Sequence, residues 1–267
     1  MNALKPSIAQ AEIERLAAFL HDAETGIREV EKITDELPAL THDDAYAIQN
    51  AILERKLKAG ARLAGRKMGL TSPAKMKQMG VEDPIHGFLT ADGCVADGAV
   101  VQMAGLIHPK VEAEIAFTTT RELAGPDCSA ATAMAAIGHV SAAIEVIDSR
   151  YRNFRFDLVS VIADNTSAAR YVIGADAVRP DGLDLRTLGV VLEKNGDVLA
   201  TGAGAAVLGH PAASLAALVN MLAAQGKTLP SGTLVMTGGV TEAFAVQPGD
   251  SVRVTVQGVG SAAMRFA

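Results

Sequence analysis

Residues 108–117 read HPKVEAEIAF, and this stretch decides how the rest of the chain is interpreted. Apolar and polar residues alternate from Val111 to Phe117, which predicts a half-buried β-strand. Alternate side chains of a strand share a face, so Glu112 and Glu114 should lie side by side. Close carboxylates repel each other in an apolar neighbourhood, and a divalent cation such as Mg²⁺ would relieve the repulsion. The alternative is a solvated strand face with two surface carboxylates.

Two further charged residues stand in unusual surroundings. Glu145 is the single charge in the run 140–147, which predicts a buried strand. A charge is rarely buried unless it is paired or bound to a metal, so Glu145 is either a third ligand or the partner of Arg150. Lys67 lies in the segment 65–72, GRKMGLTS, whose glycines let the backbone approach a ligand closely. By its spacing alone, Lys67 would be an ordinary surface lysine.

The composition excludes several classes of protein. The chain has 267 residues, of which 49% are hydrophobic and 20% are charged, as in a typical soluble globular protein. A net charge of −6 without a basic run argues against nucleic-acid binding. No apolar run approaches the length that spans a bilayer, and the N-terminus lacks a signal-peptide pattern. Cys94 and Cys128 have neither metal-site spacing nor a disulfide framework. We therefore expect a cytoplasmic protein without a membrane partner.

The residue pattern of the sequence changes near residue 60. Residues 1–60 are predicted to be helical, with a capping box at residues 7–10 and a second helix from about Thr41 to Lys58. From residue 61 to 267 the chain alternates short strands, glycines and turns, and a short helix is predicted from Ser72 to about Met79. The sequence therefore predicts an N-terminal helical region followed by a domain rich in β-strands.

Five segments together resemble the fumarylacetoacetate hydrolase superfamily, and the resemblance covers nearly the whole chain. Each is weak alone, but their order and spacing are specific: 65–72, 108–115, 145–150, 163–167 and 236–238. Within the superfamily, the chain is most similar to the branch of hydratases and decarboxylases of meta-cleavage pathways, which degrade aromatic compounds. The resemblance implies a mixed α/β protein built on a rolled β-sheet, with residues 1–60 packed against a catalytic domain at 61–267.

The resemblance also implies a set of site residues. Mg²⁺, or alternatively Mn²⁺, would be held by Glu112, Glu114 and Glu145, and Lys67 would be the catalytic residue. Five more positions would contact the substrate: Met68, Gly69, Ile85, Ser167 and Thr237.

The same resemblance implies chemistry on 2-oxo acids. Such an acid can chelate the metal through its C1 carboxylate and C2 carbonyl oxygen, so loss of CO₂ from C6 of 2-oxohex-3-enedioate would leave charge on the C2 oxygen. Many hydratases of the branch carry Pro-Asp-aromatic-Gly where this chain has PIHG at residues 84–87. Ile85 cannot act as a base and would disfavour a solvated C6 carboxylate, so decarboxylation is expected. His86 could supply a base instead, which leaves hydration of 2-hydroxypenta-2,4-dienoate as the alternative.

Two alternatives belong to other classes. A hydrolase of the same superfamily that cleaves C–C bonds would need a His–Glu base near the metal, and His108 is a candidate for its histidine. The chain could also be a non-catalytic partner that stabilises a hydratase. The resemblance implies association with the hydratase in either case, and a homo-oligomer.

Overall fold

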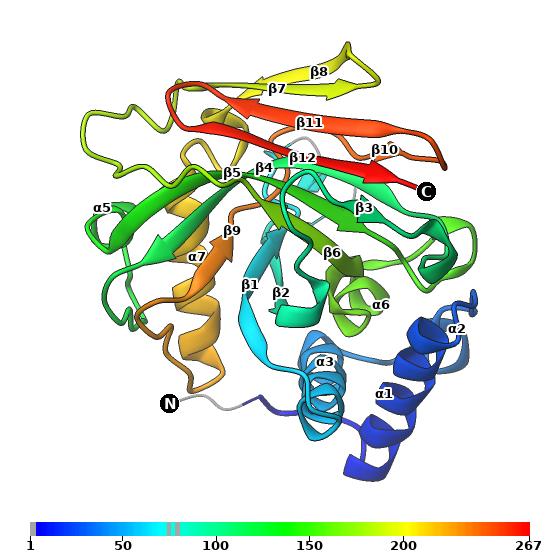
Figure 1. The fold of residues 1–267 in the computed structure, drawn as a ribbon. Coiled ribbons are helices and arrows are strands. Elements are labelled where there is room, and N and C mark those ends of the chain that lie inside the picture. Colours follow the sequence, from blue (N-terminus) through cyan, green and yellow to red (C-terminus); the bar gives the residue numbers. More distant parts are fainter. Residues whose placement is uncertain (1–3, 74–75, 78–80) are drawn as a thin grey trace.

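The chain forms two β-sheets, and the larger one carries the charged residues singled out in the sequence. The computed structural model describes residues 4–73, 76–77 and 81–267. The larger sheet has seven strands, in spatial order β2 (Ile85–Thr90), β1 (Leu63–Gly69), β9 (Leu234–Met236), β4 (Lys110–Thr119), β5 (Ile137–Ile147) and β6 (Ala168–Ile173), while β10 (Phe244–Ala245) pairs with β4. The smaller sheet has five strands, in the order β3 (Val100–Val101), β12 (Gly260–Phe266), β11 (Ser251–Val256), β7 (Gly189–Lys194) and β8 (Asp197–Ala203). The smaller sheet covers β4 and β5 (Figure 1).

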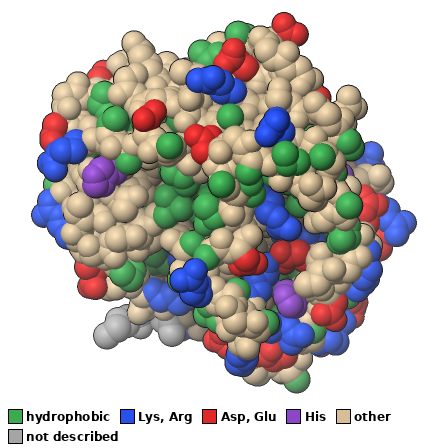
Figure 2. Space-filling view, viewed as in Figure 1, with side chains coloured by type: hydrophobic (Ala, Val, Ile, Leu, Met, Phe, Trp, Pro, Cys, Tyr) green, Lys and Arg blue, Asp and Glu red, His purple; other side chains and the backbone are tan. Residues whose placement is uncertain are grey.

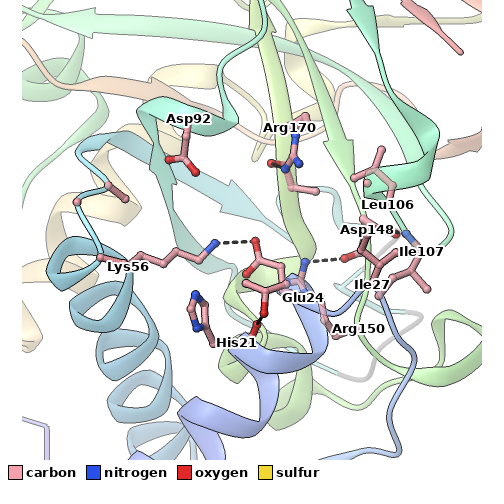
Figure 3. Close-up of a pocket in the computed structure, with 16 residues that line it drawn as sticks. His21, Glu24, Ile27, Lys56, Asp92, Leu106, Ile107, Asp148, Arg150 and Arg170 are labelled. Carbon is pink, nitrogen blue, oxygen red and sulfur yellow. Dashed lines mark hydrogen bonds and ion pairs between the residues drawn. The ribbon is translucent and has the colours of Figure 1, made fainter.

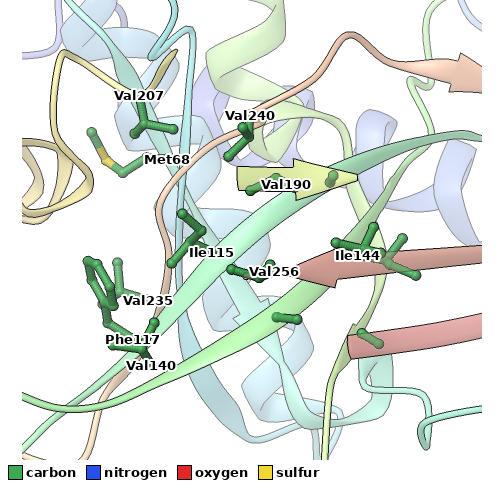
Figure 4. Packing of buried hydrophobic residues seen from close by; sticks show 14 of the residues in the cluster. Met68, Ile115, Phe117, Val140, Ile144, Val190, Val207, Val235, Val240 and Val256 are labelled. Atoms are coloured by element: carbon green, nitrogen blue, oxygen red, sulfur yellow. The ribbon is translucent and has the colours of Figure 1, made fainter. Parts of the chain in front are cut away.

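The central strand β4 has the predicted alternation. Its odd-numbered residues, from Val111 to Phe117, are fully buried in the main hydrophobic core. Figure 4 shows Ile115 and Phe117 in this core, together with Val190 and Val256 of the smaller sheet. Because side chains alternate along a strand, the even-numbered residues of β4 point to the other face of the larger sheet.

The N-terminal region contains α1 (Gln10–Thr25), α2 (Ile33–Glu36) and α3 (His42–Lys58). The predicted helix from Thr41 to Lys58 is confirmed, and Thr41 and Asp44 form its capping box. The capping box predicted at residues 7–10 is wrong, because α1 begins at Gln10 without a side-chain cap. Ser7 instead donates its hydroxyl to Asp44 Oδ2 at 2.7 Å, so a distant helix uses the group that was expected to cap α1.

The N-terminal helices share a second hydrophobic core with the rest of the chain. Leu16 of α1 and Ile48 of α3 pack in one cluster with Ile85, Phe88 and Ile162. The last of these belongs to α6 (Leu158–Ala163), a short helix beside β6 (Figure 1). The predicted mixed α/β fold, with a curled sheet and N-terminal helices packed against it, is confirmed.

Two local predictions need comment. The helix predicted from Ser72 to Met79 includes residues 74–75 and 78–79, which lie outside the described residues. The expectation that no apolar run could span a bilayer is wrong by length and composition, because the segment Gly204–Ala224 has a mean hydropathy of 1.5. Half of that window is buried, and its helix α7 (Pro211–Ala224) packs apolar side chains into the main core. We therefore interpret α7 as a core helix, and the short helix α5 (Ala130–Met134) packs beside it.

Candidate metal centre and active site

Three glutamates meet on the face of the larger sheet that lies opposite the main core. Glu112 and Glu114 come from β4, and Glu145 of β5 lies directly across from Glu112. One carboxylate oxygen of each residue lies within 4.8 Å of the other two. Glu112 is 8% exposed, and Glu114 and Glu145 are 0% exposed. The prediction that Glu112 and Glu114 share a face is confirmed, and the alternative of a solvated face is wrong.

The buried carboxylates fit a hard divalent cation. Within the described residues, Glu114 Oε1 and Glu145 Oε1 have no hydrogen-bond partner. The other oxygen of Glu114 accepts a hydrogen bond of 2.8 Å from the Gly238 N–H. Burial, reinforced by the charge of Glu145, raises the pKa of Glu114 well above its usual range. A set of three close carboxylates in apolar surroundings is the oxygen donor set that Mg²⁺ or Mn²⁺ prefers.

Lys67 extends from β1 into the same site. Its side chain is buried, and Nζ lies 3.0 Å from Glu145 Oε2 and 3.0 Å from the Thr166 carbonyl oxygen. Lys67 is therefore not a surface lysine, and it is the cation beside Glu145. The alternative partner, Arg150, forms an ion pair with Asp164 instead.

Two glycines let the chain pass close to the carboxylates after β9. Gly238 has a φ of +106°, and a Cβ on it would lie 2.1 Å from Thr71 Oγ1. A Cβ on Gly239 would lie 2.9 Å from the carboxylate of Glu112. Sequence reasoning did not assign either glycine to the site. Two consecutive glycines directly after a predicted strand were the signal that could have indicated it.

A strained turn holds the carbonyl that contacts Lys67. Asn165, Thr166 and Ser167 form the 3₁₀ turn η4 (Asn165–Ser167), and all three have left-handed backbones with φ between 50° and 59°. The Asn165 side chain accepts a hydrogen bond from Phe88 N at 2.8 Å and donates one to Phe88 O at 3.0 Å. Strain of this kind concentrates at functional sites. The hydroxyl of Ser167 is buried and has no hydrogen-bond partner among the described residues. Sequence reasoning did not include Asn165, which anchors this turn, among the site residues.

The predicted substrate contacts differ in where their side chains lie. Gly69 and Ile85 face each other across β1 and β2, and Ile85 Cγ1 lies 3.1 Å from the position of a Cβ on Gly69. Met68 instead lies in the main core, and Figure 4 shows it beside Val207. The Thr237 hydroxyl donates to the Ile115 carbonyl at 2.8 Å. Contact of these residues with substrate stays a prediction.

The two candidate histidines lie outside the carboxylate cluster. His86 stacks on Tyr46, with 4.6 Å between ring centroids, and its Nε2 lies 2.9 Å from Gln225 Nε2. Burial, together with the charges of Arg66 and Lys227, lowers the pKa of His86 to about 3. His86 is opposite Met68 in the strand register, on the face away from Lys67, so its position does not favour a role as base.

His108 has a carboxylate partner from the N-terminal region. Its Nδ1 lies 2.9 Å from Glu29 Oε1, and its ring packs against Phe154 with 5.2 Å between centroids. The chain therefore contains a His–Glu pair just before β4.

A polar cavity lies apart from the glutamates. It has a volume of about 570 Å³ and lies between α1, the end of α3 and β6 (Figure 3). Lys56 Nζ pairs with Glu24 Oε1 at 2.6 Å inside it, and Arg170 and Asp92 also line it. Figure 2 shows charged side chains of both signs gathered in a hollow on this side of the molecule. Neither Lys67 nor the three glutamates line this cavity.

Comparison with known proteins identifies the family. The family model "Fumarylacetoacetate (FAA) hydrolase C-terminal" matches residues 63–267. The 4-oxalocrotonate decarboxylase of Pseudomonas putida is 51% identical over 260 residues, which cover 97% of this chain and 98% of that protein. The 2-keto-4-pentenoate hydratase of Paraburkholderia xenovorans (strain LB400) is 36% identical over 253 residues, which cover 95% and 94%.

A solved structure is similar over the same length. The structure of 4-oxalocrotonate decarboxylase from Pseudomonas putida G7, complexed with magnesium and adipate, matches with a TM-score of 0.97 and 49% identity. The match covers 98% of this chain and 100% of that chain. The resemblance inferred from the five segments is confirmed. The chain belongs to the fumarylacetoacetate hydrolase family.

Proposed function

We propose that the chain is a carboxy-lyase that converts 2-oxohex-3-enedioate (4-oxalocrotonate) to 2-hydroxypenta-2,4-dienoate and CO₂. The observation that carries the proposal is the buried cluster of Glu112, Glu114 and Glu145 with Lys67 beside it. The 51% identity to a 4-oxalocrotonate decarboxylase supports the reaction, and the 36% identity to a hydratase makes hydration the alternative. The reaction belongs to the meta-cleavage catabolism of aromatic compounds.

The reaction needs a place for the electron pair that CO₂ leaves behind. When bound, Mg²⁺ supplies a Lewis acid that favours negative charge on the C2 oxygen of a 2-oxo acid. The bond between C5 and C6 breaks, C6 leaves as CO₂, and the electron pair moves through C4 and C3 to the C2 oxygen. That oxygen takes up one proton to give the dienol.

The residues of the chain have separate roles in this scheme. Glu112, Glu114 and Glu145 would hold the ion. Lys67, fixed between Glu145 and the Thr166 carbonyl, stabilises the negative charge that develops at the substrate head. The reaction needs no covalent adduct on Lys67. Gly69, Ile85 and Ser167 line the substrate, and we also retain Met68 and Thr237 as candidates that act through their backbone.

Product analysis with purified protein and Mg²⁺ tests the proposal. We expect CO₂ and the dienol from 2-oxohex-3-enedioate, with little further hydration. Conversion of the dienol to 4-hydroxy-2-oxopentanoate at a rate that rivals decarboxylation would establish the hydratase instead. Cleavage of an acylpyruvate would favour a hydrolase that uses the pair of His108 and Glu29. A chain without turnover of its own would be the non-catalytic partner of a hydratase.

We propose the following organisation in the cell. Residues 1–60 form a helical region and residues 61–267 form the catalytic domain, which the family match from residue 63 supports. The protein acts in the cytoplasm as a homo-oligomer and associates with a 2-hydroxypentadienoate hydratase, which would consume its product.

A further inference from the structure

We infer that Lys110 binds the C6 carboxylate of the substrate at the entrance to the metal centre. This role rests on the proposed decarboxylase function, because only a dicarboxylate substrate has a distal charge to bind. None of the similarities described above assigns a role to Lys110.

Lys110 lies on the face of β4 that carries the glutamates. It is two residues before Glu112 and four before Glu114, so the three side chains form one row. Exposure increases along this row, from 0% at Glu114 to 8% at Glu112, and Lys110 is half-buried. The centre therefore opens toward Lys110.

Gly69 and Ile85, which are expected to contact the substrate, lie on the Lys110 side of Lys67, about level with Glu114. Lys67 is level with Ala116, because both pair with Met236 of β9. Since β1 runs antiparallel to β4, Gly69 and its partner Ile85 lie one step from Lys67 in the direction of Lys110. A substrate held at the glutamates by its C1 and C2 oxygens and extended along β4 in this direction would thus point its far end toward Lys110.

The separation suits the substrate. Two residues of a strand cover about 6.6 Å, which is the step from Glu112 to Lys110 along β4. Four carbon–carbon bonds separate C2 from C6 in 2-oxohex-3-enedioate, a span of similar length.

An aromatic ring holds Lys110 without neutralising it. Its Nζ lies 4.1 Å from the centroid of the Phe154 ring, and no acidic residue forms an ion pair with Lys110 in the described part of the chain. Phe154 has a φ of +58° and Asn153 a φ of +54°, which is strained for a bulky residue. Glu29 supports this turn, because its Oε1 accepts from Asn153 N at 3.0 Å and pairs with His108. The fold therefore fixes an uncompensated cation on an aromatic face.

The expected role is in binding rather than in the chemical step. The C6 carboxylate loses its charge as it becomes CO₂, so Lys110 interacts more strongly with the substrate than with the transition state. Removal of this charge should raise KM and leave kcat nearly unchanged or higher.

Calorimetry with the Mg²⁺-loaded protein tests the role of Lys110 without turnover. The two ligands are 2-oxohexanedioate, which lacks the vinyl group needed for decarboxylation, and 2-oxohexanoate, which lacks the distal carboxylate. We expect Lys110→Met to weaken the affinity for the dicarboxylate by about 10- to 100-fold and to leave the affinity for the monocarboxylate unchanged. Lys110→Arg should retain the preference for the dicarboxylate. The exposed Lys58→Met is the matched control.

Each other outcome overturns the inference. An equal loss for both ligands would show that Lys110 acts on the substrate head or on the fold, and no loss for either would show that it does not bind substrate. If Lys110→Met fails to fold, Lys110→Gln and Phe154→Leu replace it, with the same loss of preference expected. Turnover of 2-oxohex-3-enedioate by the wild type is measured separately, so failure of the decarboxylase proposal would be recognised independently.

Discussion

Lys67 is the residue on which the proposed chemistry depends most directly. We predict that Lys67→Met lowers kcat by about 10²–10³, because one preorganised charge-stabilising group is lost. Affinity for Mg²⁺ should not fall, since loss of the cation leaves more negative charge around Glu145. Steady-state kinetics and calorimetry of Mg²⁺ binding measure the two effects. A covalent adduct at Lys67, trapped with borohydride in the presence of substrate, would contradict the proposed mechanism.

Ile85 is predicted to determine the reaction at the far end of the substrate. Ile85→Asp would place a negative charge near the C6 carboxylate, and repulsion should lower kcat/KM for decarboxylation by about tenfold or more, mainly through a higher KM. The new carboxylate could also act as a base, so we expect detectable hydration of 2-hydroxypenta-2,4-dienoate. The uncharged Ile85→Asn is the control, and product analysis of both variants is the measurement. Equal rates for the Asp and Asn variants would disprove the electrostatic explanation.

His86 should make the stability of the protein depend on pH. Its pKa is about 3 in the folded chain, against 6.5 for an unperturbed histidine. Above pH 6.5 the residue is neutral in both states, and as the pH falls toward 3 the unfolded state binds the proton first. The free energy of unfolding should therefore fall by up to about 1.4 kcal/mol per pH unit in this window. Urea titrations at several pH values give the unfolding free energy as a function of pH. This pH dependence should be shallower for His86→Gln and unchanged for the exposed His139→Gln. An equal pH dependence in all three proteins would refute the prediction.

At the scale of single elements, the η4 turn links the fold to Lys67. Asn165→Ala would leave the buried Phe88 N–H without its acceptor, which should destabilise the protein by about 1–3 kcal/mol. The turn would also lose its anchor to β2, so the Thr166 carbonyl should no longer hold Lys67 in place and kcat should fall. Thermal unfolding and steady-state kinetics measure the two effects. A variant with wild-type kcat would show that the turn does not position Lys67.

The elements also show which features a sequence can predict. The alternation in β4 predicts the face of Glu112 and Glu114 because it depends only on neighbours along one strand. The ion pair of Lys67 and Glu145 joins residues far apart in sequence, and Arg150, five residues from Glu145, was the nearer but wrong partner. The Ser7 hydroxyl likewise binds Asp44 rather than its own helix. Such partners depend on how the sheet curls, which local patterns do not specify.

At the scale of the whole molecule, the residues that determine the site come from both sequence regions. The family resemblance suggested Lys67 and the three glutamates as site residues, and the pattern in residues 1–60 suggested only helices. The structure adds Glu29 from this region, which pairs with His108 and supports the turn under Phe154. The N-terminal helices also share their core with Ile85. The helical region thus contacts residues that we propose lie near the far end of the substrate.

Metal binding should couple the site to the stability of the whole protein. We predict that Mg²⁺ at 100 times its Kd stabilises the fold by about 2.7 kcal/mol, which raises the Tm by several degrees. Without metal, burial and the charge of Glu145 raise the pKa of Glu114, so the folded state retains a proton that the unfolded state has lost. The stability of the metal-free protein therefore declines as the pH rises through that window, and Mg²⁺ replaces the proton. The difference in Tm between Mg²⁺ and EDTA should grow as the pH rises above the usual range of a glutamate, and it should be smaller and less dependent on pH in Glu114→Gln, where the raised pKa of Glu145 remains. An identical Tm with Mg²⁺ and with EDTA, or full activity in excess EDTA, would rule out a metal at the three glutamates.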